Sequence, residues 1–332
     1  MPPVPFSPLP VGLCRRRAIF RRRGNFPMQS RYPKLYGALC LLICAMLWGS
    51  TFVAQVFGAS YIGPNSYNGV RFIIGAFALI PLLLSKKKKG AIQQKSIKHT
   101  IIGALVCGTV LFAGSYFQQR GMADTTAGKA GFISALYIIL VPFIRVLWGK
   151  RVRVFAWISV AVALGGMYLL CIKPGGNLTL GTGDLMVLIS ACFYSLHIIS
   201  IDHFVEDTDP VLLSCIQFFV TGLIASGFAF ATENTTFADI MACKWAILYA
   251  GILSCGVAYT LQAVGQRTAD PLQATLLMSM ESVFSAISGA LVLGESFNAR
   301  ELGGCVLIMA AVLLGQFEDA IGPMLKKRTK QQ

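Results

Sequence analysis

A single acidic residue lies in the middle of a long apolar stretch near the end of this 332-residue chain. Glu281 belongs to the run 271–293, and it shares one helical face with the polar residues Gln273, Ser285 and Ser288. A charged group at the centre of a bilayer costs about 2.5–3.5 kcal/mol on insertion scales, so such groups usually face a cavity or a partner. Glu281 is therefore a candidate to bind a cation or proton; the alternative is a structural hydrogen bond to a neighbouring helix.

Two further apolar runs carry polar and aromatic residues at helical spacing. Trp48, Thr51 and Gln55 share one face, and a shift of 146 positions carries Trp48 onto Tyr194 and Thr51 onto His197. The two aromatic side chains can stack on a solute, although packing and interfacial anchoring also place aromatic residues in membrane proteins. The His197 imidazole can relay protons near neutral pH, and an interhelical hydrogen bond is the alternative.

Cations also occur inside apolar runs. Arg71 and Lys129 could attract a carboxylate-bearing solute, balance the charge of Glu281, or extend to the lipid headgroups. A fourth polar stripe contains Tyr259 and Gln262, together with Cys255 and Gln266, and suits the wall of a hydrated cavity. The candidate residues for substrate binding or coupling are Trp48, Arg71, Lys129, Tyr194, His197, Tyr259, Gln262 and Glu281.

No catalytic or nucleotide-binding motif accompanies these residues. The sequence lacks a zinc-protease pattern, a nucleophile elbow, a phosphate-binding loop and a dinucleotide-binding fingerprint. The ten cysteines fall mostly in apolar runs and form no C-x-x-C pair, which predicts small buried residues without metal or disulfide. We therefore expect no cofactor and no enzymatic activity, and we expect energy to come from an ion or solute gradient.

The elements that must position these residues are transmembrane helices. Hydrophobic residues make up 55% of the chain and charged residues only 13%, compared with about 25% charged residues in soluble proteins. A helix that spans a membrane needs about 20 mostly apolar residues. That length predicts an all-α membrane protein with ten transmembrane helices, at 35–57, 66–84, 100–119, 125–148, 154–172, 183–201, 211–231, 244–266, 271–293 and 299–317.

The basic residues predict the orientation of these helices. The formal net charge of +15 is concentrated at helix ends, on the side that an inside N-terminus would make cytoplasmic. This placement indicates a multi-pass protein of the plasma (inner) membrane with both termini in the cytoplasm, and it argues against a nucleic-acid partner. The basic tails at 1–34, which we expect to be disordered, and at 318–332 lie outside the helical part.

The two halves of the sequence also resemble each other. The shift of 146 residues pairs Pro64 with Pro210 and Ala123-Asp124 with Ala269-Asp270, at corresponding helix ends. This predicts two repeats of five helices, at 35–172 and 183–317. A unit with an odd number of spans enters its second copy from the opposite side of the membrane, so the repeats should be inverted. Such symmetry places a transporter's substrate site near the midplane between the halves.

Four segments resemble the EamA family of the drug/metabolite transporter superfamily: AMLWGSTFVAQ, GVRFIIGAFALIPLLL, TTAGKAGFISALYIILVPFIRVLWGKRV and LLMSMESVFSAISGALVLGESFNARELGGCVLIMAAVLL. The likeness runs from about Leu35 to Phe317. It implies ten helices in two inverted repeats around a central cavity framed by the first four helices of each half. The family's Glu-Pro is Glu281-Ser282 here, so the resemblance supplies no proline bend at that position.

The sequence thus predicts a secondary transporter of small organic solutes, such as metabolites, amino acids or drugs, that works as an exporter or exchanger by alternating access. Its partners would be the solute, a proton or counter-solute, and membrane lipid, with the chain acting as a monomer or homodimer. An integral membrane enzyme acting on lipid and a passive channel are the competing hypotheses. The scattered histidines disfavour the enzyme, and the absence of rings of repeated charge disfavours the channel.

Overall fold

The computed structural model describes residues 33–92, 94–125, 127–149, 152, 154–171, 181–269 and 271–293, together with 298–300, 302–304, 306–311 and 314. The predicted tails at 1–34 and 318–332 lie outside these residues, except for positions 33 and 34. The described chain is helical and contains no strand. An all-helical fold satisfies the backbone hydrogen-bonding groups inside each segment, as a lipid environment requires.

The helices run in the order α1 (Pro33–Ala59), α2 (Pro64–Lys88), α3 (Ile97–Gly121), α4 (Ala127–Ser134), α5 (Tyr137–Leu147), α6 (Val154–Cys171), α7 (Thr182–Val205), α8 (Pro210–Thr232), α9 (Phe237–Ala242), α10 (Lys244–Tyr249), the π-helix η1 (Ala250–Tyr259), α11 (Thr260–Gln266), α12 (Pro271–Met278) and α13 (Glu281–Leu293). Gly63-Pro64 and Asp209-Pro210 start α2 and α8, each with proline at the first helical position.

Eight helical stretches of the described chain are long and apolar enough to cross a membrane. They correspond to eight of the ten predicted spans. The predicted fifth span contains α6, in which the described side chains include the short apolar stretch Trp157–Gly166, and the predicted tenth contains the short apolar stretch Leu302–Ala311. Both stretches are shorter than the roughly 20 residues that a span needs, and the side chains that adjoin them lie outside the described part. The structure therefore confirms an all-helical, multi-pass architecture with eight candidate spans, and not the full count of ten.

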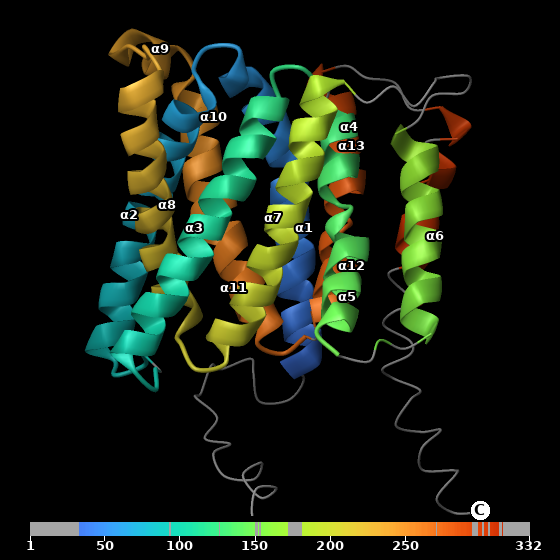
Figure 1. Ribbon diagram of the computed structural model, residues 1–332, viewed down its shortest axis with the longest axis horizontal. Helices are drawn as coiled ribbons and strands as arrows, with labels where there is room; N and C mark the ends of the chain where they lie inside the picture. Colours follow the sequence, from blue (N-terminus) through green and yellow to red (C-terminus); the bar gives the residue numbers. More distant parts are fainter. Residues whose placement is uncertain are drawn as a thin grey trace, which may run out of the picture.

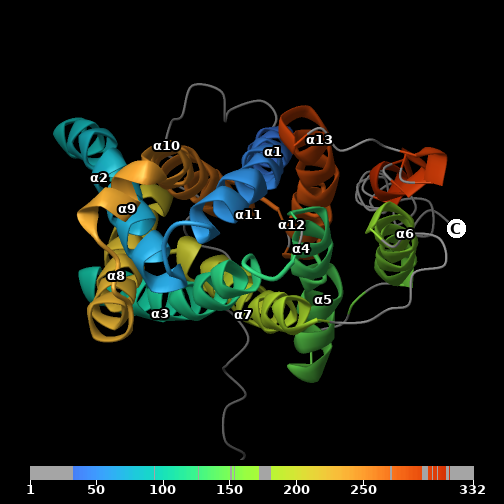
Figure 2. The same ribbon diagram turned by 90° about the horizontal axis from the view of Figure 1, so that it is seen from above.

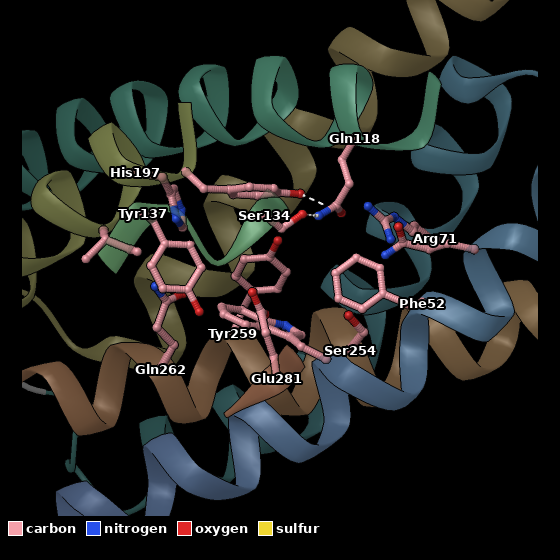
Figure 3. Close-up of a pocket in the computed structure, with 14 residues that line it drawn as sticks. Phe52, Arg71, Gln118, Ser134, Tyr137, His197, Ser254, Tyr259, Gln262 and Glu281 are labelled. Atoms are coloured by element: carbon pink, nitrogen blue, oxygen red, sulfur yellow. Dashed lines mark hydrogen bonds between the residues drawn. The ribbon is translucent and has the colours of Figure 1, made fainter. Parts of the chain in front are cut away.

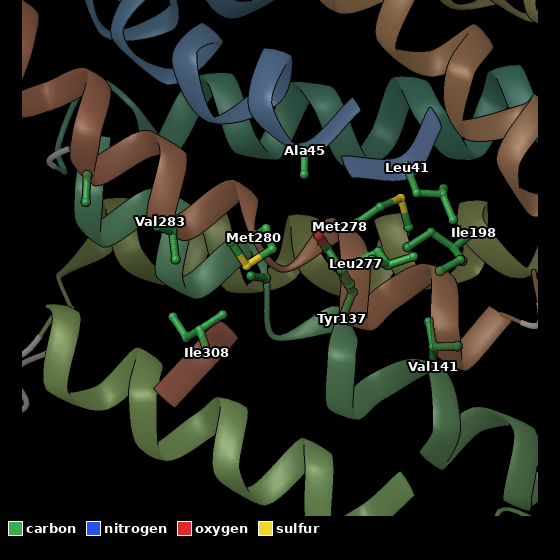
Figure 4. Packing of buried hydrophobic residues seen from close by; sticks show 13 residues of the cluster. Leu41, Ala45, Tyr137, Val141, Ile198, Leu277, Met278, Met280, Val283 and Ile308 are labelled. Atoms are coloured by element: carbon green, nitrogen blue, oxygen red, sulfur yellow. The ribbon is translucent and has the colours of Figure 1, made fainter. Parts of the chain in front are cut away.

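The long helices form one bundle (Figure 1). Helix α2 packs against α8, α3 packs against α7, and α1 packs against α13 and against the segment from α10 to α11. Helix α6 stands at one edge, opposite α2 and α8, as both views show (Figure 2). A cluster of buried apolar residues joins α1, α5, α7 and α12 (Figure 4), including Leu41, Tyr137, Ile198 and Met278. Most polar residues described below lie on the inward faces of the same helices.

Two of the predicted spans are interrupted near their middle. The span expected at 125–148 divides into α4 and α5 around Ala135 and Leu136, and the span expected at 271–293 divides into α12 and α13 around Ser279 and Met280. The first interruption precedes Pro142, which lacks an amide hydrogen for the carbonyl of Ile138, one turn before it.

The second interruption has no proline. Instead, three serines donate their hydroxyl hydrogens to backbone carbonyls three residues earlier: Ser279 to Leu276, Ser282 to Ser279 and Ser285 to Ser282, at 2.7, 2.7 and 2.9 Å. Such side-chain bonds compete with the backbone ladder and bend helices. This interruption makes Glu281 the first residue of a new helix, α13.

The predicted eighth span, 244–266, is also irregular, because it contains the ten-residue π-helix η1 between α10 and α11. Short π-helical segments occur frequently at functional sites, and the wider turn changes the direction in which side chains point. Tyr259 is the last residue of η1, and Gln262 follows in α11.

Candidate functional site

A narrow cavity lies inside the bundle. Residues from both halves of the chain form its wall (Figure 3). They belong to α1, α2, α3, α4, α5, α7, η1, α11 and α13. It is lined by Trp48, Phe52, Gln55, Arg71, Gln118, Ser134, Tyr137, Tyr194, His197, Ile198, Ser254, Tyr259, Gln262 and Glu281.

Glu281 provides a carboxylate from the start of α13. Its side chain is 4% exposed, and its Oε1 atom has no hydrogen-bond partner among the described residues. The Tyr137 hydroxyl is a neighbour of this carboxylate, but the two groups are not oriented for a hydrogen bond. Both polar atoms of the Gln262 amide are also buried without a partner. This part of the wall therefore offers a carboxylate, a phenol and an amide that are free to bind a solute or a proton.

The close packing of α1 holds Glu281 in place. A Cβ atom on Gly49 would lie 2.6 Å from the backbone oxygen of Glu281 and 2.7 Å from the backbone nitrogen of Ser285. The absence of a side chain at Gly49 is what allows α1 and α13 to approach so closely.

Arg71 lies on another part of the wall, on α2. Its side chain is 2% exposed, and its guanidinium carbon lies 5.4 Å from the centre of the Tyr67 ring and 4.9 Å from that of Phe72. None of its nitrogen atoms makes a hydrogen bond or an ion pair with another described residue. The Arg71 cation is therefore surrounded by aromatic rings and the cavity.

A chain of hydrogen bonds joins three polar groups along the wall. The Tyr194 hydroxyl donates to Oε1 of Gln118 at 3.0 Å, and Nε2 of Gln118 donates to the Ser134 hydroxyl at 3.0 Å (Figure 3). Ser134 is the last residue of α4, where the fourth predicted span is interrupted. This chain links α7, α3 and α4, and it fixes the orientation of the Tyr194 phenol.

Aromatic rings fill the space next to these polar groups. The rings of Trp48 and Tyr259 meet edge to face with centroids 4.7 Å apart, and the His197 ring lies 5.9 Å from that of Tyr259. Nε2 of His197 and Oε1 of Gln217 are 3.1 Å apart, so the imidazole takes part in an interhelical hydrogen bond. The Trp48 indole N–H is buried without a partner.

Seven of the eight candidate residues identified from sequence line this one cavity: Trp48, Arg71, Tyr194, His197, Tyr259, Gln262 and Glu281. The eighth, Lys129, belongs to α4, and its side chain lies outside the described residues. The cavity is also lined by Phe52, Gln118, Ser134, Tyr137 and Ser254, which are not among the residues predicted from the sequence. A glutamine inside an apolar run could have marked Gln118, whereas Ser134 and Tyr137 reach the cavity because of a helix interruption that the sequence did not predict.

No group of three or more His, Cys, Asp or Glu side chains in the described chain could hold a metal ion. The cavity instead combines two charged groups, several hydroxyls and amides, and an aromatic wall. With a helical bundle that crosses a membrane repeatedly, such an enclosed polar cavity defines the class of multi-pass membrane transporters.

Comparison with known proteins gives the family. The EamA-like transporter family matches residues 35–172 and 181–315. An uncharacterized transporter of Archaeoglobus fulgidus is 30% identical over 287 residues, which cover 85% of this chain and 86% of the relative. The uncharacterized inner membrane transporter YedA of Escherichia coli is 24% identical over 314 residues, which cover 90% of this chain and 97% of YedA. This chain belongs to the EamA-like transporter family.

A solved crystal structure shares the fold. It superposes with a TM-score of 0.69 at 17% sequence identity, and the match covers 86% of this chain and 97% of the other. The architecture therefore occurs in a protein of very different sequence.

Proposed function

We propose that this protein is a secondary transporter that carries small organic solutes across the plasma membrane by alternating access, as an exporter or exchanger. The observation that carries the proposal is the enclosed cavity in the middle of the bundle, where Arg71 and Glu281 are buried without an ion-pair partner among the described residues. Buried charges are normally paired. An unpaired cation and an unpaired carboxylate in one cavity are the features expected of a site that binds a solute and an ion.

Two inverted repeats of five helices would explain how such a site alternates between the two sides. The pairing of α3 with α7 has its counterpart in the pairing of α1 with the segment from α10 to α11, and α2 packs against α8. The interruptions support the same relation, since Ala135 lies 144 residues before Ser279, within two residues of the 146-residue shift that relates the two halves. In this scheme the two halves rock around the fixed cavity.

We propose Glu281 as the coupling residue, and we propose that both chain termini lie in the cytoplasm. A carboxyl group can bind and release a proton during the transport cycle, whereas an amide cannot. The C-terminal end of α2, with its run of lysines, lies at the same end of the bundle as the start of α8 (Figure 1), and this end is the proposed cytoplasmic side. A proton or a counter-solute would drive the movement of the solute.

The test uses purified full-length protein in liposomes. A thermal-shift screen against metabolites first identifies a solute that stabilises the protein, and its flux is then measured with and without a pH gradient. We expect saturable flux, counterflow, and acceleration by the gradient. Glu281→Gln should abolish the effect of the pH gradient while leaving solute-for-solute counterflow detectable.

Glu206→Gln is the matched control, because Glu206 is an exposed glutamate at the C-terminal end of α7. This variant should keep both activities. If Glu281→Gln responds to the pH gradient as the wild type does, Glu281 is not the coupling residue. Unitary conductance in a planar bilayer, without saturation or counterflow, would replace the transporter by a channel.

A further inference from the structure

We propose that Arg71 binds the carboxylate of the transported solute, so that the substrates of this protein are small organic carboxylates with an apolar or aromatic body. The inference rests on the proposed transport function and assigns its substrate class. Sequence alone left three roles open for Arg71: to extend to the lipid headgroups, to balance Glu281, or to attract an anion. The surroundings of the guanidinium distinguish among them.

Arg71 does not reach the lipid headgroups. Arg71 is 2% exposed and lies in the wall of the cavity, about two turns after the start of α2 at Pro64. A snorkelling arginine keeps its charged end in water or among headgroups and buries only its aliphatic stem. Here the guanidinium itself is enclosed, between the rings of Tyr67 and Phe72.

Arg71 also does not balance Glu281. Ion pairs between described residues, such as Lys86 with Asp209, Lys95 with Asp207 and Arg120 with Asp124, do not join Arg71 to Glu281. Glu281 instead has the phenol of Tyr137 as its neighbour. The two charged groups are therefore separate sites in one cavity, and the cation remains without an anion.

A buried cation without a counter-charge is costly, and aromatic rings compensate only part of that cost. The wall around the cavity offers further donors to an anion: the unpartnered indole N–H of Trp48 and the hydroxyl of Ser254. Guanidinium groups bind carboxylates with two parallel hydrogen bonds. An incoming carboxylate would thus satisfy Arg71 and leave Glu281 available for the proton.

The remaining wall selects the body of the solute. Trp48, Phe52, Tyr259 and Ile198 present rings and an aliphatic side chain to the cavity. The transfer of apolar solute surface from water to such a wall is favourable. A carboxylate attached to an aliphatic or aromatic group fits both features, and a strongly hydrated body such as a sugar fits less well.

The test compares carboxylates with their neutral primary amides, which have nearly the same shape. Purified full-length protein is titrated with acetate, butanoate, benzoate and phenylacetate, and with the four corresponding amides, at constant pH and ionic strength. Ligand-dependent thermal stabilisation is the measurement. We expect at least one carboxylate to stabilise the wild-type protein, with a Kd at least 10-fold lower than that of its amide.

Substitution at Arg71 locates the effect. Arg71→Gln should raise the Kd of that carboxylate by about 10- to 150-fold, which is the usual range for losing a hydrogen bond to a charged group. Arg71→Lys keeps the charge but cannot make two parallel hydrogen bonds, so it should bind more tightly than Arg71→Gln and more weakly than the wild type. Arg120→Gln removes an exposed arginine that pairs with Asp124 outside the cavity, and this variant should bind as the wild type does.

Equal stabilisation by a carboxylate and its amide would overturn the proposal, as would unchanged binding in Arg71→Gln or the absence of stabilisation by every carboxylate tested. The wild-type comparison needs no substitution, so it stands even if Arg71→Gln fails to fold. Saturable transport of neutral or cationic solutes alone would remove this substrate class and leave the proposed function intact. Absence of any saturable flux would instead contradict the proposed function.

Discussion

Buried charges occur at two places in the described part of this molecule, and they form an ion pair at only one of them. At one end of the bundle, Lys86 near the C-terminal end of α2 pairs with Asp209 at the start of α8, and both side chains are almost fully buried. In the middle of the bundle, Arg71 and Glu281 are equally buried and have no ion-pair partner among the described residues. The Lys86–Asp209 pair joins α2 to α8, whereas Arg71 and Glu281 face the cavity.

The difference separates structure from function. A buried charge in an ion pair is already compensated, so it has little tendency to bind a ligand. Removing one member of the pair leaves the other charge buried without compensation. An unpaired buried charge lowers stability until something binds to it, which is a property that selection retains where the binding is useful. Substitutions at the two places should therefore have opposite effects on the stability of the ligand-free protein.

The largest expected effect is at Asp209. Its carboxylate accepts from Lys86 and from the backbone N–H groups of Val211 and Leu212, at 3.0 and 3.2 Å. Asp209→Asn keeps a good N-cap residue but removes the negative charge that pairs with the buried Lys86, so we expect a loss of about 3–5 kcal/mol. Reversible denaturation in mixed micelles measures the change.

A second substitution tests the cause of that loss. Lys86→Met combined with Asp209→Asn also removes the buried cation, and most of the stability should return. If the double variant is as unstable as Asp209→Asn, the capping geometry and not the ion pair is what matters. Asp239→Asn, in the capping box of the short helix α9, is the control and should lower the denaturation midpoint only slightly, because its carboxylate accepts from Thr236 near the surface.

The next effect concerns the position of Glu281. Gly49→Ala would place a methyl group 2.5 Å from Cβ of Phe284 and against the backbone of α13. Because overpacking of this kind costs about 1–3 kcal/mol, we expect lower stability together with reduced flux in the liposome assay. Gly227→Ala is the matched control, since nothing lies within 4 Å of a Cβ at Gly227 in α8. Normal flux in Gly49→Ala would show that Glu281 tolerates displacement.

Arg71→Met should act in the opposite direction. The change removes an unpaired buried cation and replaces it with an apolar side chain that is nearly as long as the aliphatic part of arginine. It also removes the cation–π contacts with Tyr67 and Phe72. We expect the ligand-free protein to gain about 1 kcal/mol, because the desolvation of the charge outweighs those contacts. Differential scanning calorimetry without added solute measures this. A lower midpoint would assign Arg71 a structural role in α2 and remove the contrast with Lys86.

The sequence predicted much of the site because charge and polarity inside apolar runs are visible one residue at a time. Glu281, Arg71 and His197 each stand out against apolar neighbours, and the helical period places their companions, such as Gln262, on inward faces. The same reasoning predicted the spans, since length and hydropathy decide whether a helix can cross a membrane. Both signals are local, and the structure needed only to bring them together.

What the sequence did not predict depends on competition between bonding partners. The interruption before Glu281 arises where serine hydroxyls, beginning with that of Ser279, bond to backbone carbonyls within the helix. Serines in an apolar run also occur in unbroken helices, so the residue type does not decide the outcome. Tyr137 and Ser134 reach the cavity only because the chain turns at Ala135. The π-helix η1 likewise has no clear signal in its apolar sequence.

The smallest expected effect is at the other end of the α2 and α8 pair. There the Glu233 carboxylate accepts from the backbone N–H groups of Asn65 and Ser66, both at 2.8 Å, and the Ser66 hydroxyl bonds to Thr235. This carboxylate acts as the N-terminal cap that Gly63 lacks. It is half-buried and faces backbone groups, so Glu233→Gln leaves no orphaned charge and should cost only about 0.5–1 kcal/mol. Denaturation of this variant beside Asp209→Asn makes the comparison, and a loss as large as that of Asp209→Asn would mean that both ends of the pair depend equally on charge.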